Sequence, residues 1–155
     1  EYSVLPSVQP THATSDMYWA EDRLGHEHIG DAYAYQELLD MSGLLPLGTD
    51  FPVEGIDPLK TFYAAVVRKD VSGYPEEGFQ MENAISRSNA LKGMTLWAAY
   101  SNFEENEKGS IEVGKKADFT VLDTDLLTCS PAEILKAKVL YTVINGEIVY
   151  MNKNP

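Results

Sequence analysis

The chain has 155 residues with a hydrophobic fraction of 44%, and its 24 acidic and 12 basic side chains give a formal net charge of −12. This composition supports a packed core in one domain, or in parts of two, and excludes a disordered chain. The acidic surface would be repelled by nucleic acid and by anionic membranes, so we expect neither as a partner. The single cysteine, Cys129, excludes an intramolecular disulfide and any zinc-finger spacing. No apolar run is long enough to span a membrane, and a cytoplasmic location is the default expectation.

The first segment predicts a strand that opens into a polar loop. Residues 2–10 alternate apolar and polar side chains, as a short strand does. Residues 11–16 follow as a loop rich in hydrogen-bond donors and acceptors. Within it, His12 is either a surface hydrogen-bonding residue or a catalytic one. Asp16, or Ser15, is placed to cap the helix that follows.

Two helices are expected next, over residues 17–24 and 31–41, with a glycine-flanked loop between them. His26 and His28 lie in this loop, one residue apart. Two histidines at that spacing can chelate zinc when they lie on a strand. Because glycines place them in a loop, we do not expect a metal site there.

The stretch from Leu44 to Pro52 predicts a buried strand that ends at a carboxylate. A short apolar run reaches Gly48, then Asp50, then a proline that opposes continuation of the strand. Strand, helices and strand form a βαβ unit, whose right-handed crossover makes the two strands parallel. His12 and Asp50 would then lie at the same edge of the sheet. The alternative is that Asp50 only caps the next turn.

Helices dominate the following segment. Asp57 and Pro58 predict a capped helix start, and the apolar run from Leu59 to Arg68 predicts the helix itself. Arg68, at its end, is either a partner of the helix dipole or a substrate contact. A surface loop over 71–80 and helices over 81–86 and 88–100 complete this part.

From about residue 106 the pattern becomes that of an all-β unit. Residues 109–123 predict a hairpin, residues 130–136 a brief helix, and residues 139–150 a second hairpin with an Asn145-Gly146 turn. Four strands with one helix are too few to bury much core alone, so we expect this unit to pack on something else.

Several motifs resemble the metal-dependent amidohydrolases, specifically the amidohydrolase-3 branch that includes N-substituted formamide deformylase and YtcJ-like proteins. The stretch KGSIEVGKKADFTVLD at 108–123 is similar to the closing signature of that superfamily, together with VINGEIVY at 143–150. Upstream, VQPTH at 8–12, WAEDRLG at 19–25 and GTDFPVE at 48–54 resemble the same branch. The resemblance covers nearly the whole chain.

The resemblance implies an α/β plus β architecture. Residues 1–105 would be the last two strand–helix units of a (β/α)8 barrel, strands seven and eight with their helices. Residues 106–155 would be the carboxyl-terminal share of a composite β-sandwich whose other share comes from the protein's start. The chain is thus expected to be the last third of an enzyme of ordinary family length, and the missing N-terminal part is its first expected partner. Unpaired barrel edges also predict a homo-oligomer.

The resemblance also implies a site and a chemistry. Asp50 matches the family's aspartate after strand eight, which lies at the metal centre and handles protons, so it is our candidate catalytic residue and metal ligand. His12, Asp16 and Arg68 are the candidate substrate-binding residues. The parent enzyme would use a divalent metal, zinc first, to hydrolyse a non-peptide, amide-like C–N bond of a small molecule.

The family's other metal ligands have no counterpart in this sequence. Zinc sites use about three or four protein ligands, so we expect this chain alone to bind no catalytic metal and to be inactive. The alternative from another class is a non-catalytic structural or interaction module.

Overall fold

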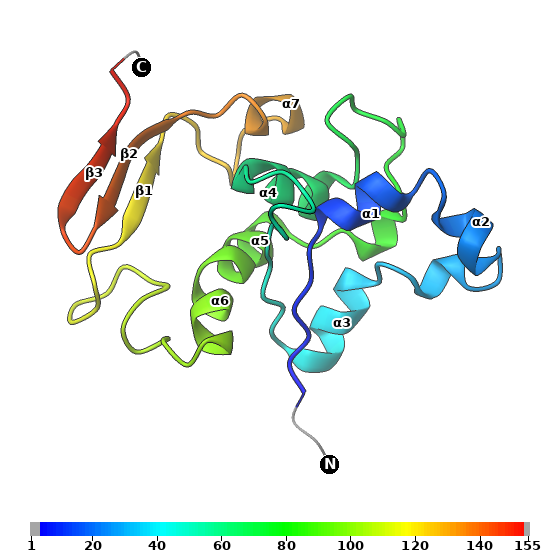
Figure 1. Cartoon of the computed structure of the whole chain (residues 1–155), viewed down its shortest axis with the longest axis horizontal. Helices are drawn as coiled ribbons and strands as arrows, with labels where there is room; N and C mark the ends of the chain where they lie inside the picture. The colour runs from blue at the N-terminus through cyan, green and yellow to red at the C-terminus, as the bar shows by residue number, and fades with distance from the viewer. Residues whose placement is uncertain (1–3, 154–155) are drawn as a thin grey trace.

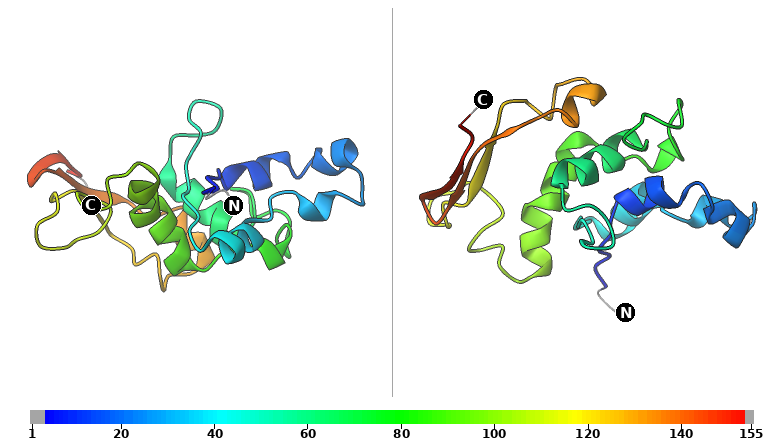
Figure 2. Two further views of the ribbon diagram at one scale, coloured as in Figure 1. Left: turned by 90° about the horizontal axis from the view of Figure 1, so that it is seen from below. Right: turned by 45° about the horizontal axis from the view of Figure 1, so that its top comes forward.

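The computed structural model describes residues 4–153. In that range the α-helices are α1 (Thr11–Asp16), α2 (Ala20–Leu24), α3 (Tyr35–Ser42), α4 (Pro58–Val67), α5 (Arg87–Met94), α6 (Leu96–Ser101) and α7 (Pro131–Ile134). The 3-10 helices are η1 (Ile29–Asp31) and η2 (Met81–Asn83), and the strands are β1 (Phe119–Leu122), β2 (Val139–Ile144) and β3 (Glu147–Met151). The sheet lies at one end of the molecule and α2 at the other, with α4, α5 and α6 between them (Figures 1 and 2). None of the helices between residues 4 and 153 has the length and apolar character needed to cross a bilayer.

The two expected strands run parallel, but each forms only a single bridge. Val8 pairs with Leu47: the Val8 N–H donates to the Pro46 carbonyl at 3.0 Å, and the Gly48 N–H donates to the Val8 carbonyl at 3.0 Å. The parallel direction is therefore confirmed. Prolines within both segments lack the N–H that a longer ladder would need. The first residues of the expected strand, 2 and 3, lie outside the described range.

The prediction of a loop over residues 11–16 is wrong, because these residues form α1. Its first turn begins as soon as the chain leaves Pro10, with the Ala13 N–H donating to the Pro10 carbonyl at 3.1 Å. The fixed φ of proline suits this position. Asp16 therefore ends α1 rather than capping the next helix, and α2 starts only at Ala20 with no side-chain cap.

Other expected helices are confirmed in place, and two of them are divided. Asp57 caps α4 by accepting from the Leu59 N–H at 3.0 Å, and Pro58 takes the first helical position. The predicted helix over 88–100 is two helices, α5 and α6, because the backbone at Thr95 turns to φ −129° and ψ −87°. The expected helix over 31–41 is likewise divided into η1 and α3.

The prediction of a hairpin over residues 109–123 is wrong, and that of a hairpin over residues 139–150 is confirmed. Residues 109–118 form no strand, and β1 instead pairs antiparallel with β2, which lies beyond α7 in the chain. Strands β2 and β3 form the second hairpin, with Asn145 and Gly146 at φ 52° and 82°. Positive φ at both positions is what a type I′ turn requires. The described residues thus contain three strands in the order β1-β2-β3.

The core joins the helices to the bridged segments. It includes Leu39, Leu45, Phe62, Ala65, Trp97 and Ile134, all buried. Helix α5 lies directly against the second bridged segment, since the Leu47 N–H donates to the Gly93 carbonyl at 3.0 Å. A Cβ on Gly93 would come within 2.8 Å of the Leu45 carbonyl oxygen and 2.6 Å of Leu47 Cγ.

Gly93→Ala should therefore destabilise the chain. Alanine normally favours a helix interior over glycine by up to about 1 kcal/mol, but here overpacking should reverse the sign and cost about 1–3 kcal/mol. Urea unfolding measures the change. Gly30→Ala is the control, because nothing lies within 4 Å of its added Cβ; equal stability of the two variants would contradict the packing described here.

Candidate functional site

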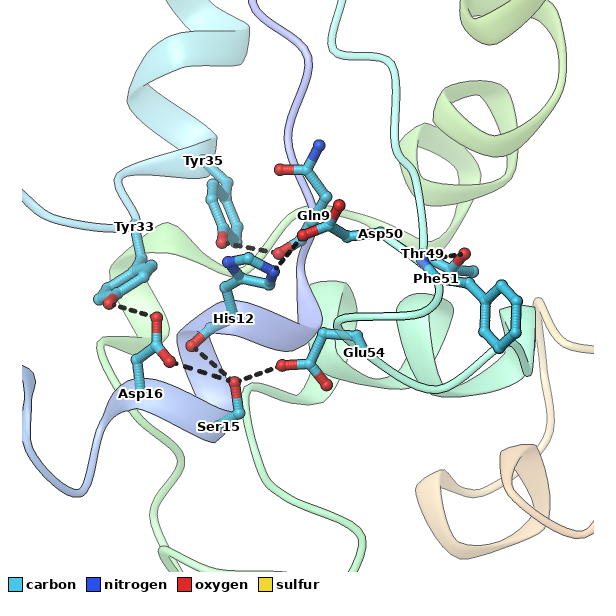
Figure 3. Close-up of polar contacts among 10 residues, drawn as sticks. All are labelled: Gln9, His12, Ser15, Asp16, Tyr33, Tyr35, Thr49, Asp50, Phe51 and Glu54. Atoms are coloured by element: carbon cyan, nitrogen blue, oxygen red, sulfur yellow. Dashed lines mark hydrogen bonds and ion pairs between the residues drawn. The ribbon is translucent and has the colours of Figure 1, made fainter.

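His12 and Asp50 meet at one edge of the bridged segments. The His12 Nε2 and Asp50 Oδ2 atoms are 3.1 Å apart, and the two side chains are 31% and 40% exposed. His12 projects from α1, which follows the first bridged segment, and Asp50 from the turn after the second (Figure 3). Parallel pairing brings these ends together, as the sequence predicts. The pair is accessible to a ligand.

The backbone of Asp50 closes the following turn, which leaves its carboxylate for His12. Asp50 has φ 58°, a left-handed conformation that is uncommon for a residue with a side chain. Its carbonyl accepts from the Val53 N–H at 2.8 Å and the Glu54 N–H at 3.2 Å. Its carboxylate contacts the imidazole and does not cap the turn. The alternative of a purely local capping role does not describe this side chain.

A second contact joins α1 to the same turn. The Ser15 hydroxyl donates to Glu54 Oε1 at 2.6 Å. Glu54 is not among the site residues predicted from the sequence. The spacing could have revealed it: Ser15 lies three residues after His12, and Glu54 lies four after Asp50. His12 and Ser15 share one face of α1, so the contact of His12 with Asp50 brings Ser15 toward the turn that carries Glu54.

Asp16 lies at the end of α1 and binds a tyrosine. The Tyr33 hydroxyl donates to Asp16 Oδ2 at 2.9 Å. Burial, and then this hydrogen bond to a carboxylate, raise the pKa of Tyr33 above its ordinary value, so the phenol stays a donor. Neither Tyr33 nor this link was foreseen from the sequence. A substrate-binding role for Asp16 stays a prediction.

Arg68 lies inside the protein rather than at the exposed edge. Its side chain is 0% exposed. It donates from Nε to the Phe79 carbonyl at 2.8 Å, from Nη1 to the Tyr33 carbonyl at 3.3 Å and from Nη2 to Gln80 Oε1 at 3.0 Å. Burial lowers the pKa of Arg68 to about 10, so it remains charged at neutral pH. Its substrate-binding role stays a prediction, and these contacts assign it a packing role.

The remaining candidates do not extend the site. His26 Nδ1 contacts Glu21 Oε1 at 2.9 Å with its ring 93% exposed. Over residues 4–153, no group of three or more histidine, cysteine, aspartate or glutamate side chains could hold a metal ion. The pair of His12 and Asp50 offers two donor groups, fewer than a zinc site uses. The described residues therefore do not by themselves fit a complete metal site.

Comparison with known proteins identifies the family. Residues 1–150 match the model of the "Amidohydrolase family" known as Amidohydro_3, and the chain belongs to that family. It is 34% identical over 143 residues to "Putative amidohydrolase YtcJ" of Bacillus subtilis, a match covering 92% of this chain and 27% of that protein. It is 31% identical over 124 residues to "N-substituted formamide deformylase" of Arthrobacter pascens, covering 80% of this chain and 22% of that protein.

A solved structure supports the same assignment. The chain resembles an uncharacterized metal-dependent hydrolase from Pyrococcus horikoshii with a TM-score of 0.71 and 30% identity. That match covers 83% of this chain and 26% of the other. The chain spans about a quarter of the length of the relatives it matches. The chain therefore belongs to the amidohydrolase family and is similar to one portion of these proteins.

Proposed function

We propose that this chain is the carboxyl-terminal portion of an enzyme that hydrolyses a non-peptide, amide-like C–N bond of a small molecule. The observation that carries the proposal is the exposed contact between His12 and Asp50. The names of the relatives, an amidohydrolase and a formamide deformylase, support the type of bond. A carboxylate beside an imidazole can accept a proton and hold a polar substrate group.

In the complete enzyme, Asp50 would take a proton from the attacking water and transfer it to the leaving nitrogen. His12 would orient the carboxylate and, with Asp16, contact the substrate. A divalent metal, zinc first, would supply an activated water and polarise the carbonyl. Because the described residues offer too few ligands, other parts of the enzyme would provide most of that site.

Replacing Asp50 tests the proposal directly. In the longer protein that contains this chain, Asp50→Asn should lower the rate of amide hydrolysis by about 100-fold or more, because the amide cannot accept the proton. Hydrolysis of N-substituted formamides and related amides is the assay. Asp40→Asn is the matched control, since Asp40 lies exposed on α3 and accepts only from Gln36 within the described residues. Near-normal turnover by Asp50→Asn would remove Asp50 from the mechanism.

We also propose the architecture that the resemblance implies. The two bridged segments would be strands seven and eight of a (β/α)8 barrel, within a domain over residues 1–105. Residues 106–155 would belong to a β-sandwich completed by the N-terminal part of the same protein. The parallel pairing at Val8 and Leu47 and the structural similarity to a metal-dependent hydrolase support this arrangement.

The exposed surface of the sheet supports the proposal that another part of the protein covers it. Every residue of β3 is exposed, and β1 and β3 are the two edges of the sheet. A cavity of about 900 Å³ between the sheet and helices α5 and α6 is lined mainly by apolar side chains. They include Leu91, Met94, Ala98, Phe119, Val143 and Ile144. The N-terminal part of the protein would cover this surface.

Left uncovered, the same surface should make the 155-residue chain associate. Ile148, Val149 and Met151 are more than half exposed, and exposed apolar edge strands pair with other copies. We expect a dimer or larger species by light scattering. Ile148→Lys, which places a charge on the edge strand, should shift the population toward monomer. A monomeric unmodified chain would contradict this expectation.

A further inference from the structure

The buried side chain of Arg68 connects to the exposed pair through two tyrosines. Its guanidinium lies over the Tyr35 ring, 5.1 Å from the centroid, and over the Phe79 ring at 5.6 Å. It also donates to the Tyr33 carbonyl at 3.3 Å. Among the described residues no carboxylate lies within ion-pair distance of Arg68. Carbonyl oxygens, an amide oxygen and aromatic faces therefore replace water around this charge.

The two tyrosines hold α1 at both ends. The Tyr35 hydroxyl donates to the carbonyl of Gln9, just before α1, at 3.2 Å. The Tyr33 hydroxyl donates to Asp16, the last residue of α1, at 2.9 Å. His12 projects from the helix between these two points and reaches Asp50 (Figure 3). The orientation of α1 thus depends on where Tyr33 and Tyr35 are held.

Uncommon backbone conformations surround the guanidinium. Tyr33, Arg68 and Gln80 have φ of 57°, 57° and 48°. Left-handed backbone at residues with large side chains costs free energy and persists only where surrounding contacts enforce it. Two of the three acceptors of the guanidinium belong to Tyr33 and Gln80. The planar fork of arginine can satisfy these separated acceptors at once, whereas an ammonium group cannot.

We infer that Arg68 is a positioning residue: it fixes Tyr33 and Tyr35, which hold α1 so that His12 faces Asp50. The catalytic role of His12 and Asp50 in this inference rests on the proposed function. The link from Arg68 through the two tyrosines to α1 rests on the contacts described above. The charge of Arg68 would then act away from the substrate, because the residue is fully buried.

Imidazole NMR spectra of the 155-residue chain test the link, because the chain has only three histidines. Arg68→Lys should move the His12 ring signals toward those of Asp50→Asn, in which the pair is lost. The highly exposed His26 ring is an internal reference. Arg87→Lys is the matched control: Arg87 donates to the Leu126 carbonyl at 2.7 Å, and the His12 signals should stay in place.

A second variant keeps the inference testable if Arg68→Lys does not fold. The double variant Tyr33→Phe, Tyr35→Phe removes only the hydroxyls that hold α1, and it should move the same His12 signals in the same direction. His12 signals unchanged in a folded Arg68→Lys chain, or moved equally by Arg87→Lys, would overturn the inference. The spectra report geometry rather than turnover, so a failure of the proposed hydrolysis would be seen separately, in the activity of Asp50→Asn.

Discussion

The pairing of two short segments around Val8 and Leu47 is the constraint on which the site depends. Two backbone hydrogen bonds fix their parallel direction. Parallel neighbours end at the same edge, so the residues that follow them must share a surface. Helix α1 follows one segment and the Asp50 turn follows the other. Without this pairing, His12 and Asp50, 38 positions apart, would have no reason to meet.

Uncommon backbone conformations gather around the site and its support. Asp50, Tyr33, Arg68 and Gln80 all have positive φ. Such conformations recur where a fold positions functional groups, since the surrounding contacts must compensate their cost. At Asp50 the conformation frees the carboxylate from the turn. Of the other three residues, Tyr33 and Gln80 supply acceptors to the buried guanidinium of the third, Arg68.

Local rules predicted those parts of the fold that depend on neighbours in sequence. The cap at Asp57, the proline after it and the Asn145-Gly146 turn are each set by the chemistry of a few consecutive residues. The parallel direction of the two segments followed from crossover handedness. These elements are found as expected.

The parts of the fold that the sequence did not predict depend on contacts between residues far apart in the chain. Helix α1 replaces an expected loop because its polar residues find partners on other segments, such as Glu54 for Ser15. Strand β1 pairs with β2 rather than with the residues just before it, 109–118, and no local pattern distinguishes those two partners. The burial of Arg68 also escaped prediction, because an arginine at a helix end is usually solvated. The strand–helix–strand pattern predicted that His12 and Asp50 lie close together, the family resemblance supplied their expected roles, and the geometry added the residues that hold them.

Our central proposal is that this chain contributes a proton-handling carboxylate, Asp50, to a metal site completed elsewhere in a longer protein. The family membership and the match to about a quarter of the relatives' length support it. Zinc analysis after exhaustive dialysis tests it most directly, applied to the 155-residue chain and to the longer protein that contains it. The account predicts at least one zinc ion per protomer in the longer protein and a clearly substoichiometric amount in the chain alone. One tightly held zinc ion per protomer in the 155-residue chain would contradict it.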